Sequence, residues 1–149
     1  MKKGGWTRLN HLQIGKYAEY FVKMEFTLYG FDVYSSEVDD RGIDFVIRRS
    51  AGHYYDVQVK SVRELNYIYF PKAKFLLRDN LLAAIVLFMP EREPALFLVP
   101  ARVWEHPSPL FVSRDYEGKQ SKPEWGLNLS HKNLTLLEPY RFEVVVETL

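Results

Sequence analysis

Residues 42–60 read GIDFVIRRSAGHYYDVQVK, and this stretch decides the fold. Ile43, Phe45 and Ile47 alternate with the residues between them, which is the pattern of a strand with two different faces. Residues 49–52 supply turn chemistry, and a second alternating run follows from Tyr55 to Lys60. The stretch therefore predicts a β-hairpin.

The polar residues of this hairpin are expected to gather on one face. If the strands pair antiparallel and bury their apolar sets together, Asp44 lies on the same face as Asp56, Gln58 and Lys60. A carboxylate buried there needs a partner. The structural alternative is an exposed outer face on which Asp44 forms a salt bridge with Lys60 or Arg48.

Composition favours one compact domain over residues 1–149. The chain has 149 residues, 47% of them hydrophobic, which is enough for one core and leaves no room for a second domain. The formal net charge is +1 with 26% charged residues, so the strong basic excess of many nucleic-acid binders is absent. Any contact with nucleic acid must come from a local patch.

The absence of cysteine excludes disulfides and thiolate metal sites and fits a reducing cytoplasm. The four histidines are scattered, so a hard metal held by oxygens is favoured over zinc. The first residues, MKKGGWTR, do not resemble a signal peptide. The longest apolar run, residues 81–89, is shorter than the ~20 residues of a membrane helix and suits a buried central strand. We expect a cytoplasmic protein without membrane association.

A long helix is expected before the hairpin. Asn10 and Gln13 resemble a capping box, and Gly30 suits the C-terminal cap, which predicts a helix over residues 11–29. Its expected core face carries Tyr17, Phe21, Met24 and Leu28, widened by Ala18 and Val22.

The remaining elements follow from local patterns. Strands are expected at 31–34, 65–70, 82–88 and 95–99, a helical turn at 101–105, a polar loop at 113–125 and a short helix at 130–137. Residues 142–149 fit no single element. Trp104 and Trp125 are expected to anchor the packing of the C-terminal part.

Three parts of this pattern resemble the PD-(D/E)XK nuclease superfamily, which includes restriction enzymes and archaeal Holliday-junction resolvases. They are an acid on the first helix, Glu19, a strand aspartate, Asp44, and the tripeptide Gln58-Val59-Lys60 after a gap of 13 residues. The Gly-Ile-Asp lead-in and the QxK variant are most similar to restriction enzymes that attack modified DNA. The resemblance covers about residues 11–100.

The resemblance implies an α/β fold, a restriction-endonuclease-like core whose central mixed sheet is flanked by helices, with a C-terminal extension at 101–149. It implies a metal-dependent endonuclease that hydrolyses DNA phosphodiester bonds with Mg²⁺ or Mn²⁺ and no small-molecule cofactor. Asp44 would be the central metal ligand, Glu19 would bind directly or through water, and the backbone carbonyl of Val59 would complete the oxygen shell. Lys60 would contact the attacking water or the scissile phosphate. Cutting both strands would require a homodimer.

Gln58 departs from the family pattern, because it stands where a second carboxylate is usual and brings no charge. Metal affinity should suffer: Asp56 on the same face could compensate, but it is expected to be a solvated strand residue. The alternative function is therefore a non-catalytic nucleic-acid-binding or assembly module that keeps the nuclease fold. A purely structural sheet domain is a third possibility. A cleft beside Lys60 would favour the nuclease, and an exposed face would favour the structural alternative.

Basic side chains near the hairpin are candidates for following a DNA backbone. We expect this of Arg48, Arg63, Lys72 and Lys74, with Arg49 and Arg78 as further members and Tyr67 and Tyr69 nearby to stack. Lys72 and Lys74 are preferred, because they lie just after the motif strands. The alternative is ordinary surface charge.

Overall fold

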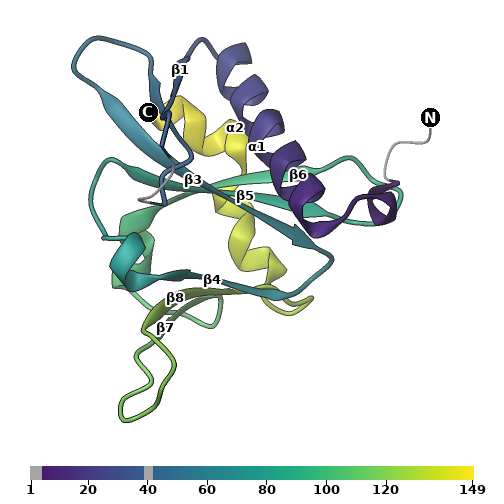
Figure 1. The fold of residues 1–149 in the computed structure, drawn as a ribbon, viewed down its shortest axis with the longest axis vertical. Helices are drawn as coiled ribbons and strands as arrows, with labels where there is room; N and C mark the ends of the chain where they lie inside the picture. Colours follow the sequence, from purple (N-terminus) through teal and green to yellow (C-terminus); the bar gives the residue numbers. More distant parts are fainter. Residues whose placement is uncertain (1–4, 39–41) are drawn as a thin grey trace.

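The computed structural model describes residues 5–38 and 42–149 (Figure 1). Residues 1–4, which enter the signal-peptide argument, lie outside the described part. The long helix is α1 (His11–Leu28) and a short one is α2 (Phe142–Val145). The strands are β1 (Asp32–Ser35), β2 (Phe45–Arg48), β3 (Tyr54–Arg63), β4 (Tyr67–Pro71), β5 (Leu81–Phe88), β6 (Ala95–Pro100), β7 (Phe111–Arg114) and β8 (Glu124–Asn128).

The larger sheet has five strands in the order β1-β2-β3-β5-β6. Strands β2 and β3 form the predicted antiparallel hairpin, with Phe45 opposite Val57 and Val46 opposite Asp56. Strand β5 runs parallel to β3 and antiparallel to β6, so the sheet is mixed. Every residue of β5 is buried, which confirms the apolar run as a central strand. The expected α/β class with a central mixed sheet is thereby confirmed.

The smaller sheet has three strands in the order β4-β8-β7. Strand β7 ends and strand β8 begins inside the segment expected to be a polar loop at 113–125, so that prediction was wrong at both ends. Only residues 115–123 connect the two strands. The pairing of β8 with β4, across more than 50 residues of sequence, supplies partners that local polarity does not reveal.

Helix α1 begins and ends as predicted. Asn10 and Gln13 form a reciprocal capping box, and Gly30 has a φ of 89° just after the helix. The N–H groups of Gly30 and Phe31 donate to Thr27 and Phe26, which completes a Schellman motif. Both ends of α1 are therefore closed by the residues that the sequence indicated.

The buried face of α1 differs from the expected one. Residues Ile14, Ala18, Val22 and Phe26 are buried, whereas the side chains expected in the core are exposed: Tyr17 by 41%, Met24 by 61% and Leu28 by 77%. Small side chains at the centre of the buried stripe bring the helix close to the sheet. The expected stripe was therefore wrong, apart from Ala18, Val22 and the partly buried Phe21.

Apolar cores lie on both faces of the larger sheet. One core joins α1 and α2 to the sheet, and the other lies between the larger and smaller sheets. Figure 1 shows α1 on one side of β3 and β5, with β4, β7 and β8 on the other. Residues 101–149 contribute to both cores, for example through Phe142 and Trp104.

The C-terminal part contains several short helices. The expected turn at 101–105 is the 3-10 helix Ala101–Glu105. The helix expected at 130–137 begins later, as the 3-10 helix Leu134–Tyr140, and passes through Pro139. The end of the chain is helical in α2 and in the 3-10 helix Val146–Thr148.

The two tryptophans hold this part as expected. The indole N–H of Trp104, which is 1% exposed, donates to the Gly126 carbonyl at 2.8 Å. That of Trp125 donates to the Phe75 carbonyl at 3.1 Å. In the part of the chain that the structure covers, no helix has the length and apolar character needed to cross a membrane.

Candidate active site where β2 and β3 part

Strand β3 extends well beyond the end of its pairing with β2. The last paired residues are Phe45 and Val57, and β3 continues to Arg63. At this point the N–H of Asp44 donates to the Val57 carbonyl at 2.9 Å. The Asp44 carboxylate accepts from the Val59 N–H, with Oδ2 2.6 Å from the nitrogen. A side chain thus replaces the next backbone partner, and the two strands separate there.

Asp44, Gln58 and Lys60 lie on the face of the sheet that points away from α1. Val57 packs in the core beneath α1, whereas Val62 packs in the core between the sheets. Because side chains alternate along a strand, Gln58 and Lys60 share the face of Val62. Continuing the register of the hairpin places Asp44 opposite Gln58. The structure thus brings these three predicted residues together.

The Lys60 side chain is half-buried beside an aromatic ring. Its Nζ lies 5.4 Å from the centroid of the Phe70 ring. Burial lowers the pKa of Lys60 below the usual value for lysine, and the negative charge of Asp44 partly opposes this shift. The site therefore places a partly desolvated lysine near the Asp44 carboxylate.

Gln58 carries an unsatisfied oxygen. Its Oε1 is buried and accepts no hydrogen bond from any residue that the structure describes. Leaving such an acceptor unpaired costs about 1–3 kcal/mol, so a native fold rarely keeps one without a reason. An amide oxygen is a suitable ligand for a hard cation.

The oxygens at this point fit a magnesium-type ion. Val57 and Val59 are two residues apart, so their carbonyl groups point to the same edge of β3, toward Asp44. A carboxylate, an amide oxygen and a carbonyl oxygen suit a metal that keeps several waters. Within residues 5–38 and 42–149, no three His, Asp or Glu side chains cluster closely enough to hold a metal. Any ion would therefore depend on the neutral oxygens as well as on Asp44.

Glu19 lies near this end of the sheet but contacts lysines. Its Oε1 is 3.1 Å from Lys23 Nζ and its Oε2 is 3.4 Å from Lys16 Nζ. Lys23 Nζ also donates to Ser35 Oγ at 3.1 Å and lies 5.5 Å from the Phe45 ring. Since Phe45 follows Asp44, these contacts place Glu19 at the same end of the sheet as Asp44. Its approach to a metal would require exchange of a lysine contact.

A cleft of ≈ 530 Å³ opens beside Lys60. Its walls come from α1, β3 and β4, and its lining residues are His11, Gly15, Val59, Lys60, Ser61, Tyr67, Ile68, Tyr69 and Pro71. A Cβ added to Gly15 would meet no atom within 4 Å, so this glycine borders open space. His11, Gly15 and Glu19 follow one another at four-residue intervals and form one stripe of α1. The cleft favours the nuclease interpretation over an exposed structural sheet.

Sequence reasoning did not identify His11, Gly15 and Ser61 as cleft residues. The four-residue spacing of His11 and Gly15 before Glu19 was the available signal for the helical wall. Ser61 follows Lys60 directly on β3. The position of β4 opposite α1 depends on the smaller sheet, for which the local sequence gives no signal.

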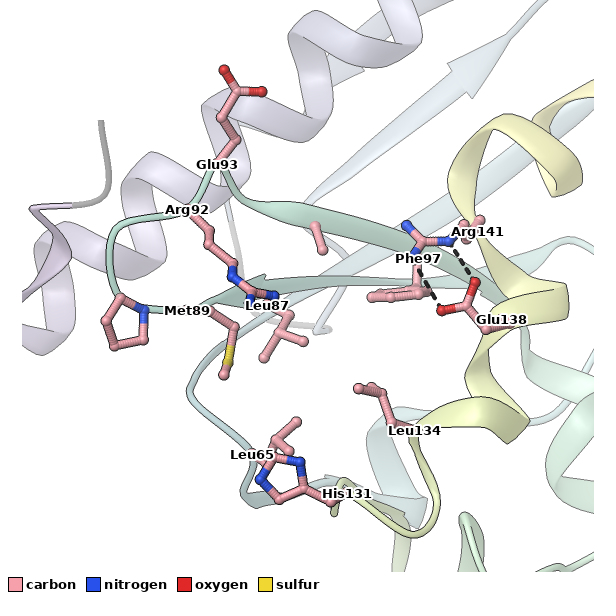
Figure 2. Close-up of a pocket in the computed structure, with 12 residues that line it drawn as sticks. Leu65, Leu87, Met89, Arg92, Glu93, Phe97, His131, Leu134, Glu138 and Arg141 are labelled. Atoms are coloured by element: carbon pink, nitrogen blue, oxygen red, sulfur yellow. Dashed lines mark hydrogen bonds and ion pairs between the residues drawn. The ribbon is translucent and has the colours of Figure 1, made fainter. Parts of the chain in front are cut away.

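A second pocket, of ≈ 520 Å³, lies at the β5–β6 hairpin and contains none of the predicted site residues. Figure 2 shows apolar side chains such as Leu65 and Leu134 in this pocket. Two of its charged residues pair with each other, because the Arg141 guanidinium contacts Glu138 at 2.7 and 3.0 Å. We therefore place the candidate active site at the Lys60 cleft.

The basic residues proposed for DNA contact do not form one patch. Arg48 donates to the hydroxyls of Tyr34 and Tyr54 on the β1–β3 part of the sheet. Arg63 donates to the backbone carbonyls of Leu9 and Asn10, ahead of α1. Both side chains therefore have structural contacts.

The three basic residues that follow β4 differ in their contacts; they are Lys72, Lys74 and Arg78. Lys72 Nζ contacts Ser113 Oγ and Asp115 Oδ1, both at 2.7 Å, whereas Lys74 is exposed. Arg78 forms an ion pair with Asp56 at 2.6 Å. The interpretation of Asp56 as a solvated residue was therefore wrong, since its carboxylate is held by Arg78.

No protein-family model and no curated protein sequence matches the chain. Its structure is similar to that of Hjc from Archaeoglobus fulgidus, a Holliday junction resolvase from an archaeal hyperthermophile. The TM-score is 0.56 at 14% sequence identity, and the alignment covers 89% of this chain and 95% of Hjc. The mixed sheet, the covering helices and this likeness show that the chain has the restriction-endonuclease-like fold.

Proposed function

We propose that the protein is a metal-dependent endonuclease that hydrolyses DNA phosphodiester bonds. The observation that carries this proposal is the meeting of the Asp44 carboxylate, the unsatisfied Gln58 oxygen and the half-buried Lys60 side chain where β2 and β3 part. A structural sheet gains nothing from a buried amide oxygen without a donor beside a desolvated cation. In a site that binds a metal ion and a phosphate group, the ion is a partner for the Gln58 oxygen and the phosphate is a partner for Lys60.

Each residue has a distinct role in this proposal. Asp44, Gln58 Oε1 and the Val59 carbonyl would hold Mg²⁺ or Mn²⁺, with Glu19 joining directly or through water. The bound ion would lower the pKa of a coordinated water and offset charge on the phosphate. Lys60 would contact the attacking water or the scissile phosphate, where its charge offsets the charge that develops on the phosphate oxygens. The low-dielectric surroundings of Lys60 strengthen that interaction.

DNA is the substrate class that we infer. The structurally similar archaeal protein is named as a Holliday junction resolvase, which favours DNA over other phosphodiesters. One site of this kind hydrolyses one bond at a time, so cleavage of both strands would require two copies of the chain. Lys74, which is exposed just after β4 at the end of the cleft, is the preferred backbone contact, whereas Lys72 would first have to leave Asp115.

Nicking of supercoiled plasmid tests the proposal directly. We expect nicked circles to accumulate in Mg²⁺ or Mn²⁺ and none to form in excess chelator, because activation of the water depends on the ion. Calorimetric titration of either metal into the protein should show saturable heat. If the folded protein neither binds metal nor nicks DNA, the nuclease proposal is wrong.

The alternative is a non-catalytic nucleic-acid-binding or assembly module with the same fold. It is favoured by one observation, that Gln58 contributes no charge where a second carboxylate would strengthen metal binding. The plasmid experiment separates the two, since a module of this kind would shift DNA in a gel without cleaving it in either metal.

Changing Gln58→Glu is expected to tighten Mg²⁺ binding at least tenfold. Two unit charges 4 Å apart attract by roughly 4 kcal/mol gross at an effective dielectric of 20, and a divalent ion doubles this. A small fraction of this attraction, left after desolvation, is enough for a tenfold change in affinity. Calorimetry of the two proteins measures the change. The control is Asp56→Asn, which alters a carboxylate on the same face that Arg78 already holds. Equal affinities for the wild type and Gln58→Glu would show that Gln58 is not a ligand.

A further inference from the structure

Two tyrosines of β4 form a stack at the Lys60 cleft. Tyr67 and Tyr69 are two residues apart on the edge strand of the smaller sheet and lie on the same face of it. Their ring centroids are 6.4 Å apart and the ring planes differ by 25°. Both residues line the cleft, and Tyr69 is 49% exposed. The stack thus ends in an aromatic ring that water can reach.

The inner member of this stack is firmly held. The Tyr67 hydroxyl donates to the carboxylate of Glu124, which is buried. The Arg114 guanidinium lies 4.4 Å from the Tyr67 ring centroid, in cation–π contact. Burial and the Glu124 contact raise the pKa of Tyr67, so its hydroxyl stays a donor across the physiological range.

Gly126 of β8 makes room for this arrangement. A Cβ at that position would lie 2.1 Å from the Tyr67 hydroxyl oxygen and 2.6 Å from two ring carbons. Any side chain there would displace the Tyr67 ring from Glu124. Arg114 and Glu124 thus hold Tyr67 beside Tyr69, and of the two tyrosines that line the cleft Tyr69 is the more exposed.

We propose that Tyr69 stacks on an unpaired nucleobase beside the bond to be cut, so the preferred substrate is DNA with an unstacked nucleotide at that place. This inference rests on the proposed nuclease function. In an intact duplex each base already lies between neighbours, and exposing a face costs a few kcal/mol. In a bulge, a branch or a mismatch the nucleotide is already partly unstacked, so exposing a face of its base costs less. Stacking on an aromatic side chain then favours such DNA over the perfect duplex.

The opposite wall of the cleft leaves space for such a base. Gly15 borders open space on α1, and Lys60 lies between this wall and β4. A nucleotide that entered would thus meet an aromatic surface on one side and a cation at the floor. The other exposed tyrosines lack this setting; Tyr20, for example, is 58% exposed on α1 and does not line the cleft.

Binding measured in chelator, where metal-dependent cleavage cannot proceed, tests the inference. The probes are two duplexes of equal length, one perfect and one with a single unpaired 2-aminopurine, whose fluorescence falls when it stacks. We expect the wild type to bind the bulged duplex more tightly and to quench the probe. Tyr69→Ala should weaken binding of the bulged duplex about tenfold, while leaving the perfect duplex unchanged. Tyr69→Trp should keep the preference.

The matched control is Tyr20→Ala, which removes a tyrosine that is exposed outside the cleft and should bind both duplexes as the wild type does. The inference is overturned if Tyr69→Ala keeps the preference for the bulged duplex, or if it weakens both duplexes equally. If the folded wild type binds neither duplex in chelator, the inference fails, and plasmid nicking in Mg²⁺ or Mn²⁺ decides separately whether the proposed nuclease function stands. All variants and both duplexes are compared at one salt concentration, since phosphate contacts make affinity salt-dependent.

Discussion

Replacing Asp44 by alanine is expected to slow plasmid nicking by about a thousandfold. A carboxylate and a divalent ion 4 Å apart attract by roughly 8 kcal/mol gross at an effective dielectric of 20. Loss of half of this would account for about three decades in rate, since each decade corresponds to about 1.4 kcal/mol. Gel quantification of nicked circles over time measures the rate, and calorimetry should show that heat of metal binding is lost in the same variant.

The same substitution also disturbs the backbone, so a second variant is needed to isolate the charge. Asp44 Oδ2 accepts from the Val59 N–H at 2.6 Å, and alanine would leave that N–H without its acceptor at a cost of about 1–3 kcal/mol. Asp44→Asn keeps an oxygen acceptor of the same size but removes the charge. We expect its free energy of unfolding in urea to stay near that of the wild type while nicking is as slow as in Asp44→Ala. Normal nicking by the folded asparagine variant would rule out Asp44 as the metal ligand.

The hairpin and the site on it could be predicted because a period of two assigns side chains to faces. Once β2 and β3 pair, Asp44, Gln58 and Lys60 have to share a face, whatever the rest of the chain does. The all-apolar β5 likewise has to be central, because both of its faces need cover. These inferences required only strand geometry and local pairing.

The buried face of α1 could not be predicted from its periodicity alone. The helix carries two apolar stripes, one through Ile14, Ala18 and Val22 and the other through Tyr17, Met24 and Leu28. Both follow helical spacing, so the choice between them depends on what the helix packs against. Phe45, Ile47 and Val57 of the sheet favour the stripe with small side chains, because it permits close approach.

The walls of the cleft depend on contacts far apart in the sequence. Strand β4 faces α1 because it pairs with β8, which lies in a segment too polar and too rich in turn residues to predict as a strand. Strand β8 is held by its pairing with β4 and by the hydrogen bond from Trp104 to the Gly126 carbonyl. At Gly126 the absence of a side chain leaves room for the Tyr67 ring. Sequence reasoning therefore identified residues on the cleft floor but could not determine what stands across from them.

Replacing Lys60 by methionine should slow nicking by about 100- to 1,000-fold while leaving the protein at least as stable. The loss of rate follows because a preorganised donor to a developing charge is typically worth that much. Stability should not fall, because burial lowers the pKa of Lys60. A lowered pKa means that the charged form of this lysine is less favourable in the folded protein than in the unfolded chain, so removing the ammonium group does not cost stability.

Three measurements together distinguish this role of Lys60 from a structural one. Methionine retains an apolar chain against Phe70, so urea unfolding should give a free energy equal to or above that of the wild type. Calorimetry should still show metal binding, since Lys60 is not a ligand. The control is Lys119→Met, which removes an exposed lysine between β7 and β8 and should nick at the normal rate. A Lys60→Met protein that is less stable and inactive would indicate that the lysine supports the fold, whereas one that is stable and inactive would place its positive charge at the reacting phosphate.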